Sequence, residues 1–205
     1  MRKLCGVVLG LALLVGTAGA ATAAPIVYTD RALWEAAVSG LTVEDFNSFA
    51  NLTVVNAGTV FPSGISVNGA DTDISDFGWG AIGEGVGLRF FSDTTITLPG
   101  APTAFGFDYV DLDLTGATIS FGAFSQALAM TGDGDAGITP DDFAFFGVVF
   151  APGDLPGGNF TIALNEGLGI DNLAFGRGSV PEPATLALLG LGLGVAGLRA
   201  RRRKA

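Results

Sequence analysis

Hydrophobic and polar residues alternate with a period of two through most of the region from Leu41 to Phe175. In the run 103–110, for instance, Phe105, Phe107 and Tyr109 fall on the same side, which predicts a strand with one buried face. Turns that contain Gly or Pro separate the runs. The predicted strands cover residues 41–46, 53–60, 64–67, 87–91, 94–98, 103–110, 115–121, 124–130, 145–150, 159–164 and 169–175, whereas 71–87 is rich in Gly and Asp and is predicted to be a loop.

One helical pattern precedes these strands, in residues 29–39. Thr29 or Asp30 can cap its N-terminus, and Gly40 ends it. Its apolar residues share one face at helical spacing: Leu33, Trp34, Ala37 and Val38. We expect Trp34 to be a packing anchor rather than a platform for a ligand.

These elements predict a mainly β fold, an antiparallel two-sheet β-sandwich of the jelly-roll-like type with one short N-terminal helix. The sixteen Phe residues of the chain are the natural filling between two sheets. Residues 24–179 are enough for one domain with its own core.

The N-terminal residues have the pattern of a Sec-type signal peptide. Arg2 and Lys3 precede an apolar stretch, and small residues ending in Ala-Thr-Ala follow it. We predict a signal helix in residues 1–23, with cleavage after Ala23. Cys5, the only cysteine, lies in this segment, so the mature chain has no disulfide of its own.

The other end of the chain has three parts. Pro181-Glu182-Pro183 forms a stiff entry, because proline fixes φ and disfavours helix before it. Residues 184–198 carry no charge, and five of the last seven residues are Arg or Lys. This pattern predicts a transmembrane helix over 184–198 with its basic end in the cytoplasm. At ~1.5 Å per residue the helix is about 22 Å long, so it either spans a thinned bilayer or serves as a temporary anchor.

The same order of motif, apolar helix and Arg-rich end resembles the PEP-CTERM protein-sorting signal of Gram-negative bacteria, over residues 180–205. The resemblance implies that an exosortase in the membrane recognises Pro181, Glu182 and Pro183 as substrate residues. It also implies removal of the tail and delivery to the cell surface or exopolysaccharide matrix. The segments TDRALWEAAVSG, LTVEDF, TAFGFDY, FFGVVF and GIDNLAFG resemble a domain common in PEP-CTERM proteins, for which no activity is settled.

The charge of the predicted domain is strongly negative. Residues 24–179 contain nineteen acidic residues against three Arg and no Lys or His, a formal charge of −16. Such a surface repels nucleic acid and anionic membranes, and it suits an extracellular protein that meets divalent cations. Acidity that only keeps a secreted protein soluble is the alternative interpretation.

Without His or Cys in this domain, carboxylates are the residues left for chemistry. They favour either calcium binding or glycoside hydrolysis by an acid pair. Glu44 and Asp45 lie in an early predicted strand, and Asp171 lies in the last one. In jelly-roll carbohydrate-binding modules, which these segments resemble, such strands lie side by side and share a structural calcium. The resemblance implies a calcium site from Glu44 or Asp45 with Asp171; solvent-facing residues on alternating strands are the alternative.

Three further features are weaker candidates. Residues 131–142 imitate a calcium-binding loop through Asp133, Asp135 and Asp142, but Thr131 and Ala136 depart from the pattern and favour a hairpin loop. Asp108, Asp111 and Asp113 form another acidic cluster, which we interpret as a solvated strand end. Trp79, in the Gly-rich loop, is the candidate for stacking on a sugar.

We therefore predict an exported surface or matrix protein that is not an enzyme. Its expected role is that of a structural or glycan-associating component, with calcium as the one candidate cofactor. The expected partners are an exosortase, the membrane through residues 184–198 before processing, and exopolysaccharide. A glycan-active hydrolase that uses two carboxylates is the alternative.

Overall fold

A computed structural model describes residues 23–76, 85–112, 115–131, 142–164 and 167–178. Residues Ala24–Val180 form a compact unit of their own. The predicted signal helix and the predicted transmembrane helix at 184–198 lie outside the described residues. Among the described residues, no helix has the length and apolar character needed to cross a bilayer.

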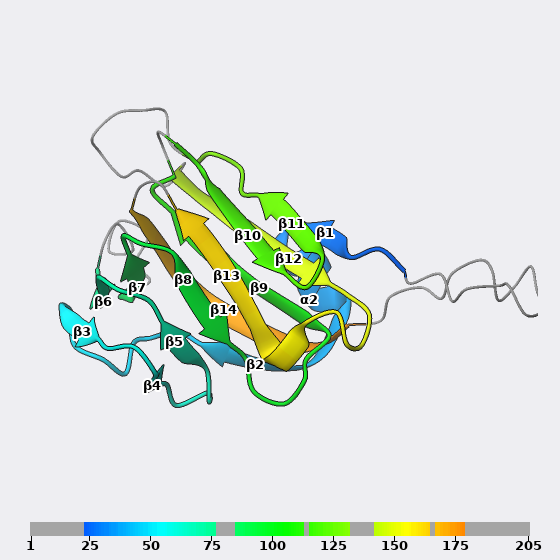
Figure 1. Ribbon diagram of the computed structural model, residues 1–205, viewed down its shortest axis with the longest axis horizontal. Helices are drawn as coiled ribbons and strands as arrows, with labels where there is room; N and C mark the ends of the chain where they lie inside the picture. The colour runs from blue at the N-terminus through cyan, green and yellow to red at the C-terminus, as the bar shows by residue number, and fades with distance from the viewer. Residues whose placement is uncertain (1–22, 77–84, 113–114, 132–141, 165–166, 179–205) are drawn as a thin grey trace, which may run out of the picture. The chain divides into compact units, whose positions relative to one another are not determined.

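Two antiparallel sheets stacked face to face make up this unit, so the predicted mainly β, two-sheet sandwich is confirmed (Figure 1). Within the described residues, the first sheet has the order β1 (Ile26–Tyr28), β12 (Phe143–Val149), β9 (Ala104–Val110), β14 (Leu168–Gly178), β7 (Gly87–Phe90), β6 (Thr72–Ser75) and β3 (Thr53–Val55), with β2 (Val38–Glu44) also paired to β14. The second sheet has the order β11 (Phe124–Ala127), β10 (Ala117–Phe121), β13 (Asn159–Leu164), β8 (Thr94–Thr97), β5 (Ser66–Asn68) and β4 (Thr59–Val60). A helix, α2 (Arg31–Ala36), and a 3₁₀ turn, η2 (Pro156–Gly158), complete the elements.

The main core lies between the sheets and is rich in phenylalanine, as the sequence predicts. Phe105 of β9 stacks on Phe160 of β13 across the two sheets, with ring centroids 4.3 Å apart and an interplanar angle of 9°. Phe107, two residues along β9, lies 6.2 Å from the same Phe160 ring. All three side chains are at most 1% exposed, so the predicted period of two correctly identifies the buried face of β9.

A second, smaller cluster covers the opposite face of the first sheet, and Trp34 of α2 is its anchor. The Trp34 side chain is fully buried, and its indole N–H donates to the carbonyl oxygen of Val148 at 3.3 Å. A Cβ atom on Gly147 would lie only 2.7 Å from Trp34 Cδ1, so glycine at this position lets the helix approach the sheet. The expected packing role of Trp34 is therefore confirmed.

The predicted helix over 29–39 is too long. The helix begins after Asp30, whose side chain accepts from the Leu33 N–H at 2.9 Å, and it ends at Ala36. Val38 and the residues after it form β2, because β14 offers them backbone partners. Leu33, which the prediction placed on the buried stripe, is 65% exposed, since so short a helix presents only Trp34 fully to the sheet.

Two predictions on strands are also wrong. Residues 53–60 form two strands in different sheets, β3 and β4, because a turn at 56–58 with Gly58 at φ 82° separates them. Residues 72–75, predicted as loop, form β6, which pairs with both β3 and β7 and buries Ile74 completely. The three-residue β1 was not predicted, since so short a strand shows no clear period; pairing with β12 forms it.

Candidate functional site

Glu44, one of the predicted calcium ligands, lies at the end of β2 opposite Leu173 of β14. Residues opposite each other in a ladder share a face, and Leu173 belongs to the main core, so Glu44 faces the core too. The Glu44 side chain is 4% exposed. Its carboxylate accepts from the backbone N–H groups of Phe46 at 3.3 Å and Ser63 at 3.1 Å. Glu44 therefore joins the end of β2 to the loop that contains Ser63.

Asp171, the second predicted ligand, lies opposite Asp108 of β9 on the outer face of the first sheet. It is fully buried, and its carboxylate accepts from the Asn172 N–H at 2.6 Å. The register shifts between Asp171 and Ala174, where Asn172 adopts a φ of 50°. The bulge separates Asp171, which lies on the outer face, from Leu173, which faces the core. Because Glu44 shares the face of Leu173, Glu44 and Asp171 point to opposite faces of the sheet.

Asp45 lies just past the end of β2 and is exposed. Its carboxylate accepts from the Asn47 N–H at 3.1 Å, which closes a local turn. Over the described ranges, no three side chains of the His, Cys, Asp or Glu type are grouped so as to hold a metal ion. The calcium site of Glu44 or Asp45 with Asp171 stays a prediction.

A network of charged and polar groups that no sequence pattern predicted surrounds the bulge. The Arg31 guanidinium binds both carboxylate oxygens of Asp108, at 3.1 Å through Nε and 2.9 Å through Nη2. Arg31 also donates to the Asn172 carbonyl oxygen at 3.0 Å, and the Asn172 amide donates to Asp108 at 3.2 Å. The guanidinium carbon lies 4.7 Å from the centroid of the Phe145 ring. The network thus ties α2 to β9 and β14.

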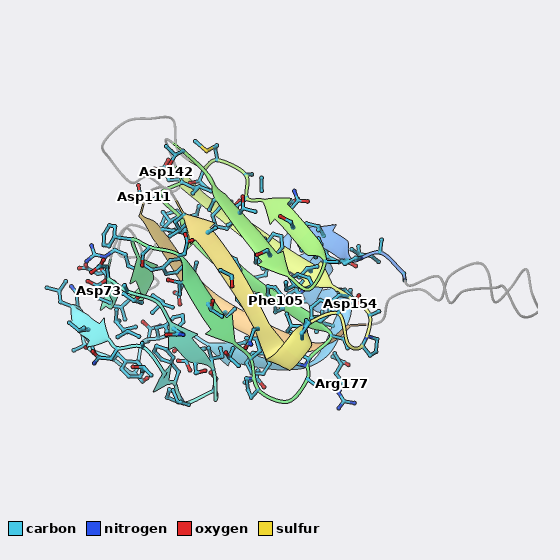
Figure 2. The ribbon with its side chains drawn as sticks, viewed as in Figure 1. Asp73, Phe105, Asp111, Asp142, Asp154 and Arg177 are labelled. Carbon is cyan, nitrogen blue, oxygen red and sulfur yellow. The ribbon has the colours of Figure 1, made fainter. Side chains whose placement is uncertain are left out.

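The two weaker acidic candidates meet at one end of the first sheet. Phe143 of β12 pairs with Val110 of β9, so Asp142 and Asp111 occupy neighbouring strand ends (Figure 2). Asp142 is 6% exposed, and Asp111 has a φ of 68°. Asp113, Asp133 and Asp135 lie outside the described residues, as does Trp79.

A groove lies where the chain crosses between the sheets, at the end of the sandwich that carries β3 to β7. The turn after β3, the turn before β6 and Phe91, which follows β7, line a volume of about 450 Å³. Two large apolar side chains border it and remain exposed, Val54 at 71% and Phe91 at 52%. Polar lining comes from Asn56, Asp71 and Asp73.

An ion pair holds one wall of this groove. Arg89 of β7 donates to both carboxylate oxygens of Asp73 of β6, at 2.9 Å through Nε and 2.6 Å through Nη2. The hydrogen bond to Asp73 raises the pKa of Arg89 above its ordinary value, against the opposing effect of burial. The guanidinium carbon of Arg89 lies 5.0 Å from the centroid of the Phe91 ring, so one cation orients both the carboxylate and the ring. Figure 2 shows Asp73 at this end of the molecule.

Backbone geometry also holds residues 70 and 71 beside Phe91. Asp71 adopts a φ of 51°, a conformation that non-glycine residues rarely take. Its carbonyl oxygen accepts from the Phe91 N–H at 3.3 Å, and the Ser92 hydroxyl donates to the Ala70 carbonyl oxygen at 2.6 Å. The groove thus presents exposed apolar side chains beside Asp73, whose carboxylate is held in place by Arg89. No sequence signal indicated it except the Asp and Gly content of 69–76.

The described fold ends with β14 at Gly178, and the segment that follows defines the class of the protein. The model of the PEP-CTERM protein-sorting motif matches residues 179–204. The protein is thus an exported β-sandwich protein with a C-terminal sorting signal, as the resemblance of Pro181-Glu182-Pro183 and its tail predicts. It contains a PEP-CTERM sorting domain, which implies a membrane-processed surface protein of Gram-negative bacteria that an exosortase recognises.

No curated protein matches the chain. Among solved structures, the chain is similar to the catalytic unit of a thermostable GH87 alpha-1,3-glucanase from Streptomyces thermodiastaticus strain HF3-3, at 15% identity and a TM-score of 0.39. The match covers 72% of this chain and 28% of the glucanase chain. This likeness is too weak to carry an argument on function.

Proposed function

We propose that the protein is a non-catalytic component of the cell surface or exopolysaccharide matrix. It is exported through the Sec pathway, held in the membrane through residues 184–198, and released by exosortase cleavage. The observation that carries the proposal is the position of the sorting motif, which begins at residue 179, directly after β14 ends at Gly178. The sandwich is then the part that remains after processing.

The engagement of its carboxylates supports a structural or glycan-associating role for the sandwich. Glu44 accepts from two backbone N–H groups, and Asp108 is held by Arg31 and Asn172. Asp73 is held by Arg89 in the same way. A catalytic acid pair needs two carboxylates that reach a substrate, whereas the oxygens of these three carboxylates accept hydrogen bonds from within the sandwich.

Cell fractionation in a Gram-negative host that has an exosortase tests the sorting. The wild-type chain, with an epitope tag inserted after Ala24, is expected in the surface or matrix fraction without its tail. A variant with Pro181→Ala, Glu182→Gln and Pro183→Ala is expected to stay in the membrane at full length, as is the wild type in a host that lacks the exosortase. Val60→Ala, an exposed change within the sandwich, is the matched control and is expected to sort normally. Equal release of the motif variant and the wild type would refute the proposal.

A further inference from the structure

The groove beside Phe91 is a built feature of the sandwich. Three chain crossings between the sheets supply its lining: β3 to β4, β5 to β6, and the start of the β7 to β8 connection. The Arg89–Asp73 pair and the hydrogen bonds from Phe91 and Ser92 to residues 70 and 71 fix the second and third of these crossings to each other, and the ladder between β3 and β6 places the first beside them. A surface that is fixed before binding loses little conformational entropy when a ligand arrives.

The lining combines the two kinds of contact that a sugar ring offers. The C–H faces of a hexopyranose are apolar, and Phe91 and Val54 present exposed apolar surface to the groove. The hydroxyl groups of the same ring are hydrogen-bond donors, and Asp71, Asp73 and Asn56 line the groove beside the apolar walls. Carboxylate and amide oxygens accept hydrogen bonds from hydroxyl groups. The volume of about 450 Å³ lies within the range of small-ligand sites.

Charge decides which glycans fit. The groove has two carboxylates in its lining, those of Asp71 and Asp73, and the guanidinium of Arg89, which binds Asp73, is a single positive charge beside them. Residues 24–179 as a whole carry a formal charge of −16. An anionic polysaccharide would meet repulsion from both the groove and the surrounding surface, whereas an uncharged one would not.

We propose that this groove is a binding site for neutral hexose residues of a polysaccharide, with Phe91 as its central contact. The inference rests on the proposed function, because a matrix protein meets such chains after export, and it names the ligand class and the site. Phe91 then has the sugar-stacking role that was predicted for Trp79, which lies outside the described residues.

Binding of neutral oligosaccharides to the purified full-length chain tests the site. The detergent must have no sugar headgroup, because such a headgroup would compete. The probes are cellohexaose, laminarihexaose and mannohexaose, with a galacturonic acid hexamer as the anionic comparison, and titration calorimetry measures the Kd. Phe91→Ala is expected to weaken binding by about tenfold or more, as removal of a central aromatic contact does. Phe91→Trp is expected to retain it.

Two control variants distinguish binding in the groove from nonspecific binding to exposed apolar side chains. Met130 is 49% exposed, close to the 52% of Phe91, but lies outside the groove, so Met130→Ala is expected to bind as the wild type does. Val54→Ser and Val60→Ser form a second pair, because the two valines are 71% and 67% exposed and only Val54 lines the groove. Weaker binding in Val54→Ser alone supports the site even if Phe91→Ala folds poorly.

Two results would overturn the inference. One is that none of the three neutral hexasaccharides binds the wild type at millimolar concentration. The other is that a folded Phe91→Ala variant, checked by its thermal unfolding, binds as tightly as the wild type. Either result leaves the sorting proposal standing, because sorting is measured by the location of the motif variants in cells. Failure of sorting with intact binding would refute the proposed function instead.

Discussion

Replacing Glu44 by alanine distinguishes its observed contacts from the predicted calcium role. The carboxylate is 4% exposed and accepts from Ser63 N–H at 3.1 Å and Phe46 N–H at 3.3 Å. A hydrogen bond to a charged group contributes about 1.5–3 kcal/mol, and the longer contact to Phe46 belongs at or below the lower end. We therefore expect Glu44→Ala to lower the free energy of unfolding by about 2–4 kcal/mol. For a unit of this size, the melting temperature falls by about 5–10 °C.

The assay is thermal and urea unfolding of the full chain, measured once with EDTA and once with calcium. The loss should be the same in both, because the two hydrogen bonds need no metal. Glu44→Gln should lose less unfolding free energy than Glu44→Ala, because glutamine keeps one acceptor oxygen. It should still be less stable than the wild type, because its amide group turns a donor toward one of the two N–H groups. Glu35→Ala is the control: Glu35 is 45% exposed and pairs with Arg31 at 3.3 Å, so its loss should stay below about 1 kcal/mol.

A loss for Glu44→Ala that appears only with calcium would refute this reasoning and favour the predicted site. Asp171 supplies the complementary measurement. A rise in melting temperature with calcium that Asp171→Ala abolishes would support calcium at the bulge of β14. If millimolar calcium shifts nothing, the main physical support for that site is lost.

Three further predictions concern the face covered by α2 and the core. Mutation of Arg31 to Ala and Asp108 to Asn, singly and together, should give a coupling free energy of about 1–2 kcal/mol in urea unfolding. The reason is that the ion pair is bidentate and both side chains are three-quarters buried. Losses of unfolding free energy that simply add in the double variant would contradict this prediction. Trp34→Ala should lower the free energy of unfolding by about 3–5 kcal/mol, because it leaves a cavity between α2 and the sheet. A decrease below about 1 kcal/mol would contradict this prediction and mean that the packing of α2 contributes little to stability. Burial raises the pKa of Tyr109 above its ordinary 10.0. The unfolded chain therefore releases this proton first, and the wild type should lose stability relative to Tyr109→Phe as pH rises through about 10; parallel pH profiles would contradict this.

Part of this structure followed from local sequence patterns. Alternation in 103–110 identified the buried face of β9 because each strand residue reports its own side of the sheet. Trp34 was correctly predicted to be a packing anchor, but the helical stripe that contained it was too long and placed the exposed Leu33 on its buried side. The order of Pro181-Glu182-Pro183, an apolar run and a basic end indicated the sorting signal, since it is read as a linear segment.

The features that depend on pairing between distant segments could not be predicted. Residues 72–75 look like loop, and become β6 only between β3 and β7. Arg31 and the Asn172 carbonyl oxygen meet across 141 positions of sequence, and Arg89 meets Asp73 because two strands align in one register.

The predicted calcium residues show the same division. The sequence alone determined that Glu44 and Asp45 lie in an early predicted strand and Asp171 in the last one, and that residues 24–179 contain no Cys or His. Only the tertiary structure decided that Glu44 turns toward the core while Asp171 lies on the outer face. A single extra residue at the β14 bulge reverses the alternation, and a period of two cannot show where such a residue falls until the partner strand is in place.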